Sequence, residues 1–266
     1  MTTAEQLKQD ALPQRCLYVY GIVDRLPQGE GSGESGDGWE LTGTGRVAVA
    51  HRWLDPAELD DLNADVAEGS RLADLARRHD FVVRALASRG AVLPVRLGTL
   101  LPDRASVLRL LHDSEERLAA ELDRIRDRGE WAVRIKAIQH NADPAAELEQ
   151  PARAAAPGGS GTAYLVGRRD AHRKRTVLRE SLVGRMTELH ETLSGLADAV
   201  AGPGAIPETT SVSAAYLVDA ANQAEFTAMA EEAVAELEGL GCVSLVRGPL
   251  PAYSFVDVRL ETPGHV

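Results

Sequence analysis

Three glycines near the N-terminus have the spacing of a nucleotide-phosphate loop. Gly31, Gly33 and Gly36 satisfy G-x-G-x-x-G, a pattern in which backbone N–H groups at the start of a helix bind a pyrophosphate. Glu34 and Asp37 lie among these glycines and would repel phosphate, and a strand pattern rather than a helix follows them. The run therefore predicts an acidic, flexible loop and not a dinucleotide site.

The other candidate sites are weaker. PGGSGT at residues 157–162 precedes a predicted helix but lacks the lysine of a P-loop, so it predicts a linker and helix cap. The sequence has no G-x-S-x-G, H-E-x-x-H or kinase signature. Cys16 and Cys242 lack the spacing of zinc ligands, and His79 falls on the apolar face of its predicted helix, where a core histidine is expected. We expect no catalysis, no metal and no cofactor.

The densest group of positive charges lies near the start of a long predicted helix. Such a run is usually a solvated helix face, and its functional alternative is docking to an acidic partner. Both interpretations stay open for these candidate partner-binding residues, which are Arg168, Arg169, Arg173, Lys174 and Arg175.

The composition of the 266-residue chain is typical of a soluble globular protein, with 44% apolar and 26% charged residues. A formal net charge of -11 argues against a nucleic-acid surface, because duplex binding needs an excess of Lys and Arg. No segment reaches the ~18 uninterrupted apolar residues that a membrane span requires, and the N-terminus lacks the apolar stretch of a signal peptide. The sequence predicts a cytoplasmic protein with one large or two modest domains.

The first half of the chain predicts three strands and two helices. Strand patterns occur at residues 16–23, 47–53 and 91–97. One helix begins near Ser70 and stops at Gly90, and the other is capped by Asp103 and stops at Gly129.

The second half predicts a strand at residues 131–138, an Ala, Pro and Gly-rich loop at 141–161, and then a long helix with a core stripe from Leu178 to Leu196. A strand at 212–218, a helix from Asp219 to Gly239, and strands at 242–246 and 253–258 complete it. This order reads β-α-(β)-β-α-β, a ferredoxin-like plan with two helices on one face of an antiparallel sheet. We expect an α+β protein with a flexible N-terminus (1–15), an N-terminal domain (16–129) and a C-terminal domain (130–260).

Four stretches in order resemble one family. LYVYGIV at 17–23, AVLPVRLGTLL at 91–101, AAYLVDAANQAEF at 214–226 and GPLPAYSFVDV at 248–258 are similar to segments of the gas vesicle protein F/L (GvpF/GvpL) family. Leu97, Leu250 and Ala252 depart from its usual residues. The family-signature positions are Tyr18, Tyr20, Gly21, Pro94, Arg96, Gly98, Gly248, Pro249, Pro251, Tyr253 and Phe255.

The resemblance implies a non-enzymatic accessory or minor structural protein of gas vesicle assembly, with a modified ferredoxin-like C-terminal domain. It implies contacts with the major shell protein and other accessory proteins, in the cytoplasm and on gas vesicles. Arg96 is expected inside a strand with a structural partner, and Pro249, Pro251, Tyr253 and Phe255 are expected to form a rigid turn and pack the core. If Tyr253 is exposed instead, it becomes a candidate partner anchor.

The competing hypothesis is a small-molecule-binding or enzymatic domain, because ferredoxin-like folds host many unrelated functions. A deep cleft with converging His, Asp or Arg groups would favour it. A shallow surface with an apolar or charged patch would favour assembly.

Overall fold

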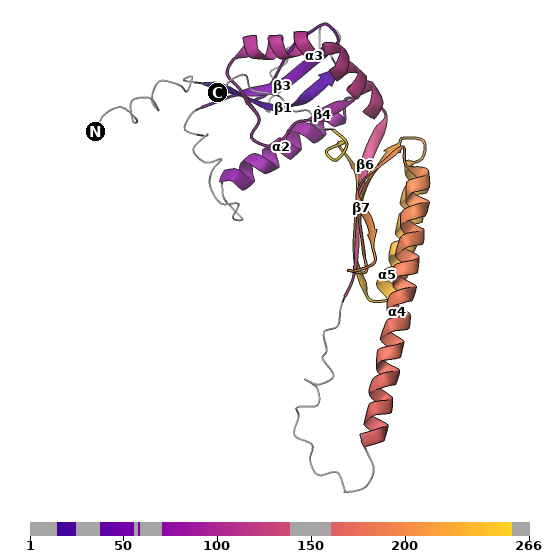
Figure 1. The fold of residues 1–266 in the computed structure, drawn as a ribbon. Helices are drawn as coiled ribbons and strands as arrows, with labels where there is room; N and C mark the ends of the chain where they lie inside the picture. Colours follow the sequence, from indigo (N-terminus) through magenta and orange to yellow (C-terminus); the bar gives the residue numbers. More distant parts are fainter. Residues whose placement is uncertain (1–14, 25–37, 56–57, 59–70, 139–160, 257–266) are drawn as a thin grey trace, which may run out of the picture. The chain divides into compact units, whose positions relative to one another are not determined.

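The computed structural model describes residues 15–24, 38–55, 58, 71–138 and 161–256 (Figure 1). Three predicted segments lie outside these residues: the N-terminal stretch 1–15 except Arg15, the glycine run at 31–36, and the loop at 141–161 except Gly161. The chain divides into two compact units, one formed by the residues up to Glu130 together with those from Pro249 onward, and the other by Trp131–Gly248. The predicted domains 16–129 and 130–260 stay a prediction.

An antiparallel sheet lies at the centre of the first unit. Its strands follow the order β2-β3-β1-β4, and β5 also pairs with β1. The bounds are β1 Cys16–Asp24, β2 Glu40–Thr44, β3 Val47–Leu54, β4 Val92–Pro94 and β5 Leu100–Leu101.

Strand β1 is buried on both faces because a helix covers each side of the sheet (Figure 1). Tyr18 and Tyr20 pack with Val83 and Leu86 of α2 (Arg71–Ala87). Helix α3 (Arg104–Ile125) covers the other face and begins where predicted, since the Asp103 carboxylate accepts hydrogen bonds from the Ser106 N–H and hydroxyl at 2.7 and 2.8 Å.

The predicted strand at 91–97 is too long. Only Val92–Pro94 pairs with β1, and the chain then turns, with Gly98 at φ 83° and the Thr99 N–H donating to the Arg96 carbonyl at 3.2 Å. Arg96 is therefore exposed in a turn, and its predicted place inside a strand is wrong.

The second unit contains a four-stranded sheet in the order β7-β8-β6-β9. Along the chain the elements run β6, α4, β7, β8, α5, β9. Their bounds are β6 Arg128–Ala137, α4 Gly161–Leu196, β7 Ala199–Ile206, β8 Ser211–Asp219, α5 Gln223–Gly239 and β9 Cys242–Leu250.

Two helices cover one face of this second sheet. Trp131, Val133 and Ile135 alternate along β6 toward them, as predicted from the strand pattern. They pack with Phe226 of α5 and with a stripe on α4 that begins at Leu182. The predicted stripe began one turn earlier, at Leu178, but that side chain is 46% exposed.

The end of the described chain differs from the predicted strand pair. Strand β9 continues to Leu250, four residues beyond its predicted end, and residues 251–256 form turns rather than a strand. Pro251 and Ala252 are buried, whereas Pro249 is exposed and Tyr253 is 38% exposed. The expectation that Pro249 and Tyr253 pack the core is wrong.

Candidate protein-interaction surfaces

Helix α4 is exposed over residues 166–181 and buried on one face beyond them. Every residue from 166 to 181 is exposed, whereas Leu182, Met186, Leu189 and Leu193 in the second half are buried. We call residues 166–181 the α4 arm. It spans about 24 Å at 1.5 Å per residue, and Figure 1 shows it continuing past the end of the sheet.

The arm carries all of the basic residues that the sequence singled out. Arg168, Arg169, Arg173, Lys174 and Arg175 are exposed. Six of the sixteen arm residues are basic and two are acidic, and within the described part of the chain no ion pair is recorded for those five side chains. The arm is thus a cationic segment of an acidic protein.

Apolar side chains lie between these charges. Val166, Val177 and Leu178 are 45%, 57% and 46% exposed. Val166, Arg173 and Val177 are spaced by seven and four residues, so they share one face of the helix. An exposed face that mixes aliphatic and guanidinium groups is suited to an amphipathic acidic partner.

Arg179 fixes the base of the arm. Its Nη2 donates to the carbonyls of Pro207 and Glu208, both at 3.1 Å, and its Nε donates to the Thr210 hydroxyl at 3.3 Å. Because Pro207–Thr210 form the turn between β7 and β8, the arm leaves the sheet in a defined direction. No sequence pattern indicates this role, because Arg179 resembles the other arginines of the basic helix.

The outer face of α5 has the opposite charge. Phe226, Ala230 and Leu237 point into the core. The helix contains no Lys or Arg, and its five exposed carboxylates belong to Glu225, Glu231, Glu232, Glu236 and Glu238. Glu236 pairs with Arg185 of α4, and Glu238 accepts from the Ser244 hydroxyl. The sequence already placed these glutamates outside the core stripe.

Tyr253 lies on a turn that the first unit holds firmly. The Glu130 carboxylate accepts hydrogen bonds from the Ser254 N–H and hydroxyl at 2.7 and 2.8 Å, and Arg124 donates to the Phe255 carbonyl at 2.6 Å. Burial raises the pKa of the Glu130 carboxyl above its usual 4.5, and burial also raises the pKa of the Tyr253 phenol. The partly exposed Tyr253 ring is therefore presented on a fixed segment.

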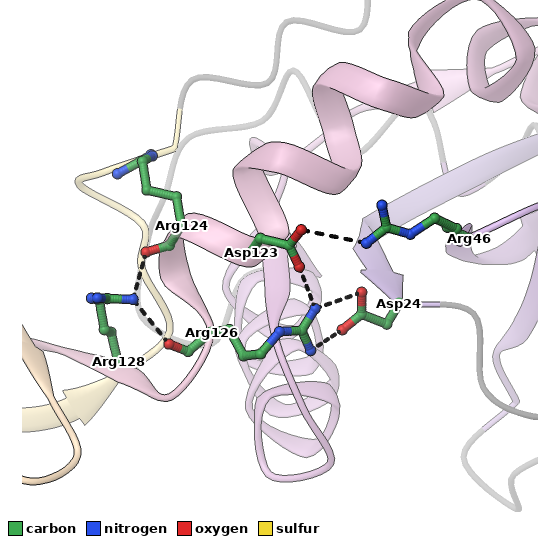
Figure 2. Close-up of polar contacts among 6 residues, drawn as sticks. All are labelled: Asp24, Arg46, Asp123, Arg124, Arg126 and Arg128. Carbon is green, nitrogen blue, oxygen red and sulfur yellow. Dashed lines mark hydrogen bonds and ion pairs between the residues drawn. The ribbon is translucent and has the colours of Figure 1, made fainter.

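A network of charges joins β1, α3 and the start of β6 in the first unit (Figure 2). The Arg126 guanidinium donates to both carboxylate oxygens of Asp24 at 2.7 and 3.2 Å and to Asp123 at 2.8 Å. Arg128 donates to the carbonyls of Arg124 and Arg126, at the C-terminal end of α3. These partners raise the pKa of Arg126, and the hydrogen bond from Arg126 is the main cause that lowers the pKa of Asp123, so Arg126 and Asp123 stay charged. The network is structural, as helix-end arginines often are.

His79 and the two cysteines lie buried in the core. His79 is buried and forms a 2.8 Å hydrogen bond between its Nδ1 and the Tyr18 hydroxyl, which confirms the predicted core histidine. Burial lowers the pKa of His79 and favours its neutral form. Cys16 and Cys242 are buried free thiols. In the residues that the structure describes, no group of three or more His, Cys, Asp or Glu side chains could hold a metal, and no helix is long and apolar enough to cross a membrane.

These features define an α+β protein with two helix-covered antiparallel sheets. Crystal structures of gas vesicle protein GvpF share this fold: the Anabaena sp. PCC7120 protein superposes with a TM-score of 0.58 over 92% of this chain and 99% of its own, and the Microcystis aeruginosa protein with 0.59 over 91% and 99%. Both are 16% identical to this chain.

The sequence comparisons identify the family. Residues 16–257 match the model of the family described as gas vesicle synthesis protein GvpL/GvpF. Gas vesicle protein L of Streptomyces sp. (strain CB03234) is 31% identical over 262 residues, which cover 93% of this chain and 95% of that protein. The chain belongs to the GvpL/GvpF family of gas vesicle proteins, as the four sequence stretches predicted. The GvpL/GvpF family is not a known enzyme family.

Proposed function

We propose that this chain is a non-catalytic accessory protein of gas vesicle assembly that binds the major shell protein and other accessory proteins in the cytoplasm and on the vesicle. The family supports the gas vesicle role. The α4 arm carries the proposal of binding, because most helical stability in proteins comes from packing of an apolar face, and Val166, Val177 and Leu178 of the arm are exposed. A partner would supply the missing cover.

In this proposal the arm's cations make the contact, with Tyr253 as a second candidate anchor on the other unit. Aromatic and arginine side chains are the commoner hot spots of protein interfaces. The proposed architecture is two domains, at 16–129 and 130–260. The second is a modified ferredoxin-like fold, which its strand order β7-β8-β6-β9 and its β-α-β-β-α-β chain order support.

A pull-down of the purified chain against the major shell protein, at low and at high ionic strength, tests the binding. We expect capture at low salt that weakens at high salt, because exposed charge pairs are screened. Arg169→Glu/Arg173→Glu should lose capture. The matched control is Arg117→Glu/Arg134→Glu, which makes the same charge change at exposed positions outside the arm and should bind as the unaltered chain does.

Two results would contradict the proposal. No capture of the shell protein or of any other gas vesicle protein would remove the binding role. Equal capture by the arm variant and the control would move the contact away from the arm, and Tyr253→Ala would then show whether the fixed turn provides it.

A further inference from the structure

We propose that the α4 arm docks on the acidic outer face of α5 in a second copy of this chain. The inference rests on the proposed docking role of the arm and names one partner for it. The arm contributes six basic residues against two acidic ones, and α5 contributes five carboxylates and no cation. Each surface is the electrostatic complement of the other, and both belong to the second unit.

The carboxylates at the C-terminal end of α5 oppose its helix dipole. The C-terminal end of a helix favours cations. Helix α5 has no basic residue in its last turn, where Glu236 and Glu238 lie. A cationic partner would therefore stabilise this end of the helix.

One copy cannot make this contact with itself. Helix α4 is continuous through the base of the arm, from Gly161 to Leu196, so the arm cannot fold back onto α5 without breaking the helix. The pairing is nevertheless of a kind that the chain already uses. Arg185, one turn beyond the arm, forms an ion pair with Glu236 of α5 in the same copy.

The two surfaces also match in length and accessibility. The arm spans about 24 Å, and the 17 residues of α5 span about 26 Å at the same rise. Glu231 and Glu232 are exposed at the middle of α5, and Arg169 and Arg173 are exposed one turn apart on the arm. Two antiparallel copies could form this contact twice, each arm lying on the partner's α5.

Sedimentation of the full chain over a range of concentrations tests the inference. We expect a concentration-dependent dimer at low ionic strength that dissociates at high ionic strength. Arg169→Glu/Arg173→Glu and, separately, Glu231→Arg/Glu232→Arg should each weaken association about tenfold or more, as close interfacial charge pairs do. Arg117→Glu/Arg134→Glu is the matched control and should dimerise like the unaltered chain.

The charge swap makes the test specific. Each variant reverses two charges on only one of the two contacting surfaces, so an equal mixture should form a mixed dimer at concentrations where either variant alone is mostly monomeric. All four substitutions in one chain should restore self-association. A monomer under every condition, or a mixture that stays monomeric while circular dichroism shows both variants folded, would overturn the inference.

The α5 variant separates this inference from the proposed function, because its arm is unchanged. If the chain captures the shell protein through the arm but never dimerises, only the self-contact is wrong. If it dimerises as described but captures no gas vesicle protein, only the proposed binding function is wrong.

Discussion

At the scale of single residues, the buried Glu130 carboxylate is the group on which the terminal turn most depends. It is 4% exposed and accepts both hydrogen bonds that Ser254 offers. The sequence interpretation missed it, because Glu130 directly precedes a predicted strand and resembles a surface glutamate. Its partner is 124 residues away, and no local pattern connects the two.

We expect Glu130→Gln to destabilise the first unit by about 1–3 kcal/mol, since the amide cannot accept both bonds and leaves a buried group unsatisfied. The cost should depend on pH. Burial raises the folded-state pKa of Glu130 above 4.5, so its contribution is fully present below that value and is lost as pH rises through the raised pKa. Urea unfolding of the unaltered chain and of Glu130→Gln across this pH range measures the difference between their free energies of unfolding. A difference that is constant, or that grows with pH, would contradict this account.

At the scale of elements, several could be predicted from sequence because their signals are local. The Asp103 cap, the alternation at Trp131, Val133 and Ile135, and the glutamates of α5 were all visible in short windows. Strand β7 was not. Gly202, Pro203 and Gly204 indicate a break, yet the strand accommodates them with a register shift in which Gly202 and Gly204 take φ of 100° and 69°.

The uncovered arm could not be predicted for a different reason. Leu178 continues the helical spacing of Leu182 and Met186, so periodicity alone extends the core stripe to it. Whether a sheet lies beneath a helical position is decided by strand length and by pairing between distant segments. The basic residues could therefore be found from the sequence, but the exposure of the helix that carries them could not.

Two leucine substitutions compare the exposed arm of α4 with the buried second half of the same helix. Leu193→Ala should cost about 2–5 kcal/mol, because Leu193 is fully buried and its removal leaves a cavity. Leu178→Ala, the same substitution on the exposed arm, should change the free energy of unfolding by less than about 0.5 kcal/mol. Denaturant unfolding of the two variants compares them directly. Equal costs would mean that the arm is covered.

At the scale of the whole molecule, net charge conceals how the charges are distributed. A value of -11 predicts that the chain does not present a nucleic-acid surface. It coexists with a helical segment that carries six cations and with another helix that carries five carboxylates and no cation. This segregation is the basis of both proposals, because separated patches of opposite sign direct specific association in a way that evenly mixed charges do not.

Genetic complementation read by electron microscopy tests whether the chain serves gas vesicle assembly through its α4 arm. A strain lacking this gene should form few or no normal vesicles. The unaltered gene and Arg117→Glu/Arg134→Glu should restore them, and Arg169→Glu/Arg173→Glu should not. Normal vesicles in the deletion strain would rule out the assembly role, and equal rescue by the arm variant would rule out the arm as its binding surface.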